Sequence, residues 1–202
     1  MASNKKLVTV LILVLVGIAV VLSYENLSNG ANSSSARPSN VTVGSLAPNY
    51  GFFLENGSEA NLSAYRGHPV VLWFVATWCS SCAQGNQAIN SSYQFFKRRG
   101  IRIVELELYK DLGYSGPSIT NFVSSYAPDA YSNGTVIPAY AEYNMTAKYD
   151  PQGYLDIYYL ISGNGTVLYI NGSPESTLGQ LEQARPKAIF GAPKFRDELS
   201  RR

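Results

Sequence analysis

The feature that most constrains the fold of this chain is an unbroken apolar run that leads into its only two cysteines. The stretch "PVVLWFVA" covers residues 69–76, and Trp78, Cys79 and Cys82 follow closely. β-Branched and aromatic residues without polar alternation predict a central strand whose two faces are both covered by other elements. We therefore expect an α/β domain in which the cysteines follow the central strand.

The residues after the cysteines predict a helix that ends at Gly100. Serines open this segment, three basic residues at 97–99 fill its last turn, and glycine is favoured directly after a helix. Cys79 is therefore expected at the helix N-terminus, where unpaired backbone N–H groups and a partial positive charge favour the thiolate. Cys82, one turn further on, is expected to be shielded and able to resolve a mixed disulfide formed at Cys79.

The remaining chain alternates between strand and helix patterns. Residues 101–109 alternate like a strand, 118–127 resemble a short helix, and 156–161 and 166–170 flank "SGNG" as a hairpin. A last amphipathic helix is predicted over 176–184. A βαβ unit followed by a hairpin and a helix predicts a mixed sheet flanked by helices.

The N-terminus predicts a membrane anchor. Lys5 and Lys6 precede sixteen uncharged, mostly aliphatic residues at 7–22, which as a helix would span about 24 Å of a hydrocarbon core of about 30 Å. A cleaved secretory signal is the alternative, but residues 21–23 form a poor cleavage site. Either interpretation leaves the lysines in the cytoplasm and everything after Leu22 outside it.

Composition divides the chain into four parts. Residues 1–24 form the cytoplasmic stub and anchor, 25–40 a flexible linker rich in Ser, Asn and Gly, 41–184 one domain, and 185–202 a basic tail. Nothing in the sequence indicates nucleic-acid binding.

Ten Asn-x-Ser/Thr triplets suggest a glycosylated surface, in keeping with an extracytoplasmic domain. The triplets begin at Asn26, Asn32, Asn40, Asn56, Asn61, Asn90, Asn133, Asn144, Asn164 and Asn171. Several of them also suit turns, which is the alternative explanation of the pattern.

Three short motifs give the domain a family resemblance. They are Gly-x-x-Ala-Pro at Gly44, Ala47 and Pro48, Leu-x-x-Tyr-x-Gly at Leu62, Tyr65 and Gly67, and Ala-x-Trp-Cys-x-x-Cys at Ala76, Trp78, Cys79 and Cys82. With these motifs, residues 41–184 resemble the membrane-anchored thioredoxin-like proteins of the TlpA/ResA (redoxin) type. The resemblance implies a thioredoxin fold with an N-terminal β extension, behind an N-terminal transmembrane helix.

The resemblance also implies a function. It is that of a membrane-tethered, extracytoplasmic thiol–disulfide oxidoreductase, in which Cys79 attacks, Cys82 resolves and Trp78 packs beside the redox disulfide Cys79–Cys82. Protein thiols and disulfides and an unidentified redox partner would be its partners, and no cofactor or metal is expected.

Three positions depart from the family pattern. Ser81 replaces the usual proline before the second cysteine, and Trp73 stands where cytoplasmic thioredoxins carry a buried aspartate. Leu155 or Asp156 occupies the place of the cis-proline that packs against the active disulfide. We expect a trans peptide there, in a loop that still approaches Cys79 and contacts the substrate, because a cis bond before a non-proline residue costs about 3–4 kcal/mol.

Other interpretations of the dithiol stay open. It could bind Cu(I), since soft thiolates select that ion, or form a permanent structural disulfide. His68, the only histidine, is interpreted as a solvated loop residue, so a closed four-ligand zinc site cannot be built. Glu105 and Glu107 share one face of a strand near the site and could shuttle protons, although one exposed and one salt-bridged carboxylate is the favoured interpretation.

Overall fold

The computed structural model describes residues 41–172. The predicted membrane segment, the linker, the helix at 176–184 and the basic tail lie outside the described residues. Within 41–172, no helix is both long and apolar enough to cross a membrane.

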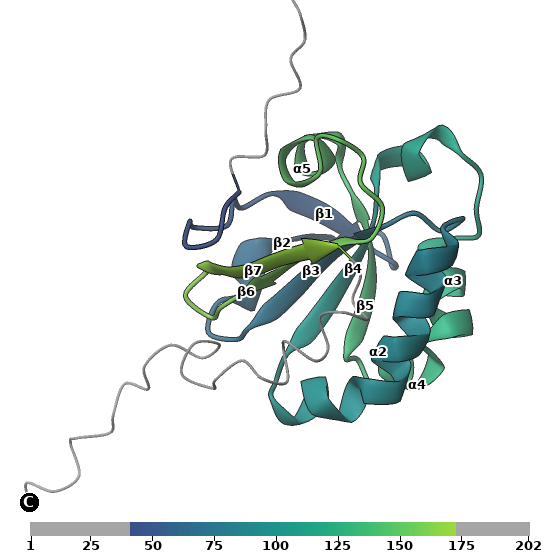
Figure 1. Cartoon of the computed structure of the whole chain (residues 1–202), viewed down its shortest axis with the longest axis horizontal. Helices are drawn as coiled ribbons and strands as arrows, with labels where there is room; N and C mark the ends of the chain where they lie inside the picture. The colour runs from purple at the N-terminus through teal and green to yellow at the C-terminus, as the bar shows by residue number, and fades with distance from the viewer. Residues whose placement is uncertain (1–40, 173–202) are drawn as a thin grey trace, which may run out of the picture. The chain divides into compact units, whose positions relative to one another are not determined.

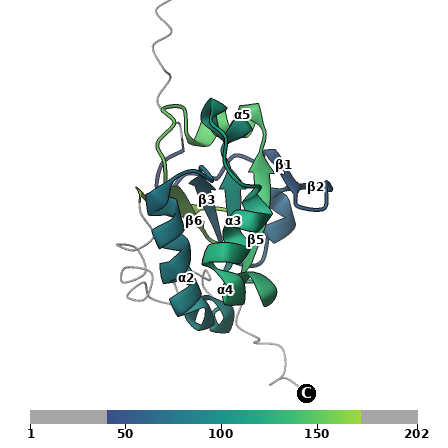
Figure 2. The same ribbon diagram turned by 90° about the vertical axis from the view of Figure 1, so that its right-hand side faces the viewer.

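The described residues form a seven-stranded mixed sheet in the order β2-β1-β5-β4-β3-β6-β7. The strands are β1 (Gly51–Leu54), β2 (Glu59–Asn61), β3 (Val70–Val75), β4 (Arg102–Glu107), β5 (Val136–Ala141), β6 (Ile157–Ile161) and β7 (Val167–Gly172). The helices are η1 (Leu62–Tyr65), α2 (Ser80–Arg98), η2 (Tyr109–Gly113), α3 (Ile119–Tyr126), α4 (Pro128–Ser132) and α5 (Tyr143–Tyr149). The helices α2, α3 and α4 lie together along one face of the sheet, and α5 lies apart from them (Figures 1 and 2).

The apolar run forms β3, as predicted. It is buried along its whole length and lies between β4, with which it is parallel, and β6, with which it is antiparallel. Because side chains alternate along a strand, Val71, Trp73 and Val75 enter one core and Val70, Leu72 and Phe74 enter the other. One run of sequence thus supplies both layers of the core.

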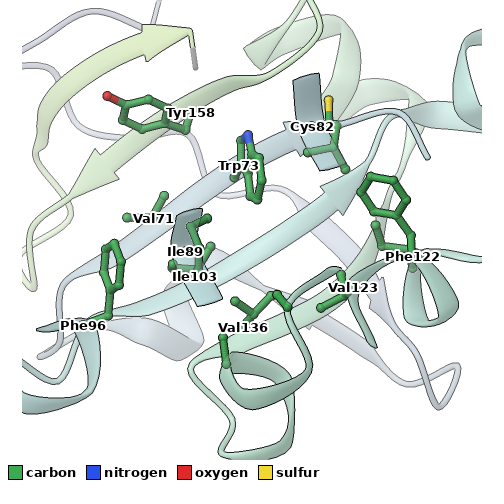
Figure 3. Close-up of a cluster of buried hydrophobic side chains, with 14 of the residues drawn as sticks. Val71, Trp73, Cys82, Ile89, Phe96, Ile103, Phe122, Val123, Val136 and Tyr158 are labelled. Carbon is green, nitrogen blue, oxygen red and sulfur yellow. The ribbon is translucent and has the colours of Figure 1, made fainter. Parts of the chain in front are cut away.

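The first core lies between the sheet and the helices α2 and α3. Trp73 of β3 and Cys82 of α2 both belong to it, together with Ile89 and Phe122 (Figure 3). The second core lies on the other face, where Met145 and Tyr149 of α5 pack with Phe74. Cys82 is therefore part of the hydrophobic core.

Helix α2 has the predicted ends. Cys79 is its N-cap residue, Lys97 and Arg98 lie in the last turn, and Gly100 follows the C-cap with a φ of +63°. A left-handed φ at this position is the reason why glycine suits it. The predicted helix at 118–127 is confirmed as α3, and the predicted hairpin as β6 and β7.

Strand β5 was not predicted from the sequence. It carries Pro138 and lies between β1 and β4, where proline is unusual because it donates no hydrogen bond. Placing β5 beside β4 brings a third parallel strand to the edge of the sheet that carries the dithiol.

Helix α4 is held by an asparagine of α2. The N-cap residue of α4, Ala127, has no side chain that could cap the helix. Asn90 instead accepts hydrogen bonds from the backbone N–H groups of Asp129 and Ala130, at 2.9 and 3.0 Å. This side chain joins α4 to α2.

Candidate functional site

The two cysteines lie where β3 gives way to α2. The N-cap residue Cys79 has an extended backbone, and its Sγ accepts a hydrogen bond from the backbone N–H of Cys82 at 3.2 Å. The Ser81 hydroxyl lies 3.1 Å from the same sulfur. Both contacts lie at the N-terminus of α2, next to the Cys79 sulfur.

Both cysteines are free thiols in this structure, and they differ in access. Cys79 keeps a small exposed fraction of 5%, whereas Cys82 has none. The Cys82 thiol donates to the Cys79 sulfur, and the two sulfurs are 2.6 Å apart. Any molecule from solvent therefore meets Cys79 first, and Cys82 is already within reach of it.

The pKa of the Cys82 thiol is strongly raised. Burial is the main cause, the hydrogen bond to Cys79 is the second, and the negative charge of Asp156 adds a smaller contribution. Cys82 thus keeps its proton at neutral pH while Cys79 faces the helix N-terminus. This asymmetry distinguishes an attacking from a resolving thiol.

Asp111 fixes the segment before the dithiol. Its carboxylate accepts from the Thr77 backbone N–H at 2.9 Å and from the Thr77 hydroxyl at 2.8 Å. Its backbone carbonyl accepts from the Trp78 indole N–H at 3.0 Å. Asp111 was not identified from the sequence, because these contacts join residues more than thirty positions apart.

The Asp111 turn has an unusual backbone. Lys110, Asp111 and Leu112 have φ values of 52°, 52° and 58°, in the left-handed region. Each such residue costs roughly 1–2 kcal/mol, so the contacts to Thr77 and Trp78 must offset that cost.

Two aromatic rings stand exposed beside the dithiol. Trp78 is 39% exposed and Tyr114 is 67% exposed, and their ring centroids are 4.8 Å apart. Trp78 was predicted to pack beside the cysteines, whereas Tyr114 was not identified. Together the rings offer an apolar surface next to Cys79.

A buried carboxyl group lies behind Cys82, and the favoured interpretation of it was wrong. Glu105 is fully buried in β4 and accepts a hydrogen bond from the Asn86 side chain at 2.6 Å, so it is neither exposed nor salt-bridged. Asn86 also donates to the Cys82 carbonyl oxygen at 3.3 Å. Burial raises the pKa of Glu105 to about 8, the hydrogen bond from Asn86 lowers it and the charge of Asp156 raises it.

Asp156 lies immediately before β6 and is, with Leu155, one of the two residues expected at the place of the family's proline. It is buried, has a φ of +73°, and accepts a hydrogen bond from the Trp73 indole N–H at 2.8 Å. A buried carboxylate therefore contacts the side chain at position 73, and it comes from the segment just before β6. Leu155 is half-buried and packs against the core cluster that contains both cysteines.

Two further expectations concern this region. No peptide bond in residues 41–172 is cis, as expected for a loop without proline. His68 is exposed in the loop before β3. Among the described residues, no group of three or more His, Cys, Asp or Glu side chains is arranged to hold a metal ion.

This geometry can be compared with known proteins. Residues 43–153, more than half of the chain, match the AhpC/TSA family. The chain belongs to the AhpC/TSA family. Its dithiol and its Asp111 turn lie inside the matched region, and the Leu155–Asp156 loop follows directly after it.

Relatives of this AhpC/TSA chain carry names that refer to disulfide chemistry. The thiol-disulfide oxidoreductase ResA of Bacillus subtilis (strain 168) is 33% identical over 95 residues, which are 47% of this chain and 51% of ResA. The thiol:disulfide interchange protein DsbE of Vibrio cholerae is 27% identical over 110 residues, 54% of this chain and 57% of DsbE. The chain thus spans about half the length of these relatives, and the predicted resemblance to redoxins is confirmed.

Solved structures confirm the fold. A thioredoxin-like protein from Aeropyrum pernix has a TM-score of 0.53 and 21% identity, covering 83% of this chain and 96% of that protein. A thiol:disulfide interchange protein from Bacteroides sp. has a TM-score of 0.54 and 15% identity, covering 79% and 97%. The AhpC/TSA domain described here has a thioredoxin-like fold.

Proposed function

We propose that this chain is a thiol–disulfide oxidoreductase that exchanges disulfides with protein substrates through Cys79 and Cys82. The observation that carries the proposal is the unequal pair: a Cys79 sulfur at a helix N-terminus, with a protonated, buried Cys82 thiol 2.6 Å away. The names of the ResA and DsbE relatives support the same chemistry.

The exchange takes two steps. The Cys79 thiolate attacks one sulfur of a substrate disulfide, which forms a mixed disulfide and releases the other substrate sulfur as a thiolate. The Cys82 sulfur then attacks Cys79, the Cys79–Cys82 disulfide forms, and the second substrate sulfur leaves. The two leaving sulfurs end as thiols: one proton is the proton that Cys82 gave up, and the other comes from solvent.

In this direction the substrate is reduced and the dithiol is oxidised. A dithiol donor must then reduce Cys79–Cys82 before another turnover. The same steps run in reverse when the disulfide form meets a substrate dithiol. The reduction potential of the pair relative to its partners decides the direction.

The surroundings of the dithiol support substrate binding. Trp78 and Tyr114 offer an exposed apolar surface for a polypeptide segment beside Cys79. Leu155 and Asp156 belong to the loop that would contact the substrate on another side, although the carboxylate of Asp156 is engaged with Trp73.

The location belongs to the same proposal and rests on the sequence. An anchor at 7–22 would place the dithiol domain outside the cytoplasmic membrane, where cysteines encounter oxidising conditions. Retention of the chain in membranes after high-salt and carbonate washes tests this part. Recovery of the whole activity in a soluble fraction with a new N-terminus near Tyr24 would contradict it.

The chemistry is tested with two matched cysteine variants. Cys79→Ser should lower exchange with a cystine-containing protein by at least about a hundredfold, because the nucleophile is lost. Cys82→Ser should keep the first step and accumulate a mixed disulfide that can be seen on a non-reducing gel. Equal and slow alkylation of both thiols in the reduced protein, with unchanged exchange in Cys79→Ser, would overturn the proposal.

A further inference from the structure

The turn that holds the dithiol also lines a separate cleft. This cleft has a volume of about 500 Å³, and it lies where β4 and β5 end and α5 begins. The strands β3, β4 and β5 are parallel, so the cleft and the dithiol open at the same edge of the sheet. Lys110 lines the cleft, and its neighbour Asp111 anchors Thr77.

Aromatic rings form much of the cleft wall. Phe53 and Tyr109 are each 39% exposed and Tyr143 is 64% exposed. The rings of Tyr109 and Tyr143 meet edge to face at 5.6 Å, which fixes their orientation. The Lys110 ammonium already lies 5.4 Å from the centroid of the Tyr109 ring, so this wall accepts a positive charge.

Two carboxyl groups line the cleft among these rings, and one of them, Glu142, has no structural task that explains its position. Glu142 is the N-cap residue of α5, but its side chain makes no capping hydrogen bond. Glu107, from the end of β4, accepts from the backbone N–H of Ile119 and otherwise faces the negative charge of Asp111. Two carboxyl groups and one lysine leave the cleft with an excess of acidic groups.

We infer that this cleft binds a positively charged side chain, arginine or lysine, of the protein whose disulfide the dithiol exchanges. Flat aromatic faces attract cations and carboxylates pair with them, and the combination suits a guanidinium or ammonium group on an apolar stem. The inference rests on the proposed function, because it assigns to the same reaction a preference for substrates with a basic residue near the cystine.

The pH dependence follows from the groups around Glu107. Burial and the charge of Asp111 raise its pKa to about 7, against the lowering effect of the hydrogen bond from the Ile119 N–H. Among the described residues, the other ionisable groups that line the cleft are Lys110, Glu142 and the tyrosines Tyr109, Tyr140 and Tyr143. A bound cation favours the ionised carboxylate. Binding should therefore strengthen as the pH rises from about 6 to about 8, with release of a proton.

The test uses the full chain and pairs of cystine peptides that differ in one residue. One peptide of each pair carries arginine and the other its neutral analogue citrulline, placed about three to ten residues from the cystine, a reach of roughly 10–35 Å. We expect kcat/KM for the arginine peptide to be about tenfold higher at the spacing that fits. Equal values for arginine and citrulline at every spacing would overturn the inference.

Variants of the cleft sharpen the test. Glu142→Gln and Tyr143→Ala should each remove most of the arginine preference and leave turnover of the citrulline peptide unchanged. Lys110→Gln removes the resident cation and should increase the preference, a gain that loss of structure would not produce. Tyr126→Ala, at an exposed tyrosine of α3 outside the cleft lining, is the matched control and should change nothing.

A direct binding measurement separates the two proposals. In the disulfide-oxidised protein, the arginine peptide should shift the backbone amide resonances of residues 142–144, and the citrulline peptide should not. If neither peptide is turned over, the proposed function fails, and this measurement then decides alone whether the cleft takes a cation. Identical spectra with both peptides would overturn the cleft assignment whatever the activity shows.

Discussion

Two buried carboxyl groups lie near the dithiol, and they are held in opposite ways. Asp111, in the turn at the end of β4, has each of its oxygens paired with a donor from Thr77. Glu105, in the middle of β4, has one oxygen bonded to Asn86, while its other oxygen has no hydrogen-bond partner within the described part of the chain.

The comparison shows that burial alone does not decide what a carboxyl group does. Where every oxygen meets a donor, as at Asp111, the group acts as a clamp on the backbone. Where the donors are too few, as at Glu105, burial favours the neutral acid, and this group is linked to Cys82 through Asn86. The Asp111 contacts thus fix the segment before Cys79, whereas the Glu105 carboxyl group can gain or lose a proton.

The largest expected effect concerns Glu105 and pH. A carboxyl group with a higher pKa in the folded chain binds more protons when folded, so stability falls as the pH rises from about 4.5 to about 8. The ionised form should cost up to about 5 kcal/mol above that range. Glu105→Gln should therefore be less sensitive to pH and more stable than the natural chain at about pH 9.

This prediction is measured by urea unfolding of the disulfide-oxidised protein, in which no cysteine ionises. Glu59→Gln, at an exposed carboxylate, is the matched control and should follow the natural chain. A variant Glu105→Gln with the same slope of unfolding free energy against pH would show that the carboxyl group is ionised in the folded protein.

The next effect concerns the two hydrogen bonds that Asp111 accepts from Thr77. Asp111→Ala leaves the Thr77 N–H and hydroxyl without acceptors in a buried place and should reduce the free energy of unfolding by about 2–4 kcal/mol. Asp111→Asn keeps one acceptor and tolerates the left-handed backbone, so it should lose roughly half as much. Urea unfolding of both variants checks the order, and a loss under about 1 kcal/mol in Asp111→Ala would mean that the turn does not depend on these bonds.

The smallest effect concerns Asp156, whose carboxylate accepts a hydrogen bond from the Trp73 indole N–H. Asp156→Asn keeps an acceptor for the Trp73 indole N–H and removes the negative charge, so the pKa of Cys82 should fall. Closure of the Cys79–Cys82 disulfide from a mixed disulfide should then be roughly threefold faster at neutral pH. Stopped-flow measurement of the closing step checks this, and an unchanged or slower rate would contradict the role of the charge.

The sequence predicted those parts of the molecule that depend on residues close together in the chain. The apolar run, the N-terminal cysteine and Gly100 lie within about thirty residues, and each follows from strand, cap or turn preferences.

The missed features depend on contacts between distant parts of the chain. The bonds from Asp111 to Thr77 and from Asp156 to Trp73 join different elements, and no local pattern announces them. The spacing of Glu105 and Glu107 suggested one exposed and one salt-bridged carboxylate, but α2 covers Glu105 and brings Asn86 to its carboxyl group. Pro138 concealed β5, because proline within a run argues against an internal strand.

The cap that Asn90 provides for α4 bears on whether a glycan can be attached at this asparagine. Asn90 opens one of the ten Asn-x-Ser/Thr triplets, yet its amide nitrogen lies 3.2 Å from the Asp129 carboxylate while its oxygen holds the start of α4. A sugar linked to that nitrogen would take up the space of this contact. A glycan at Asn90 would thus crowd the contact with Asp129 while the side-chain oxygen keeps its bonds to the start of α4. A count of triplets says nothing of such contacts, so the ten triplets are not ten equally open attachment points.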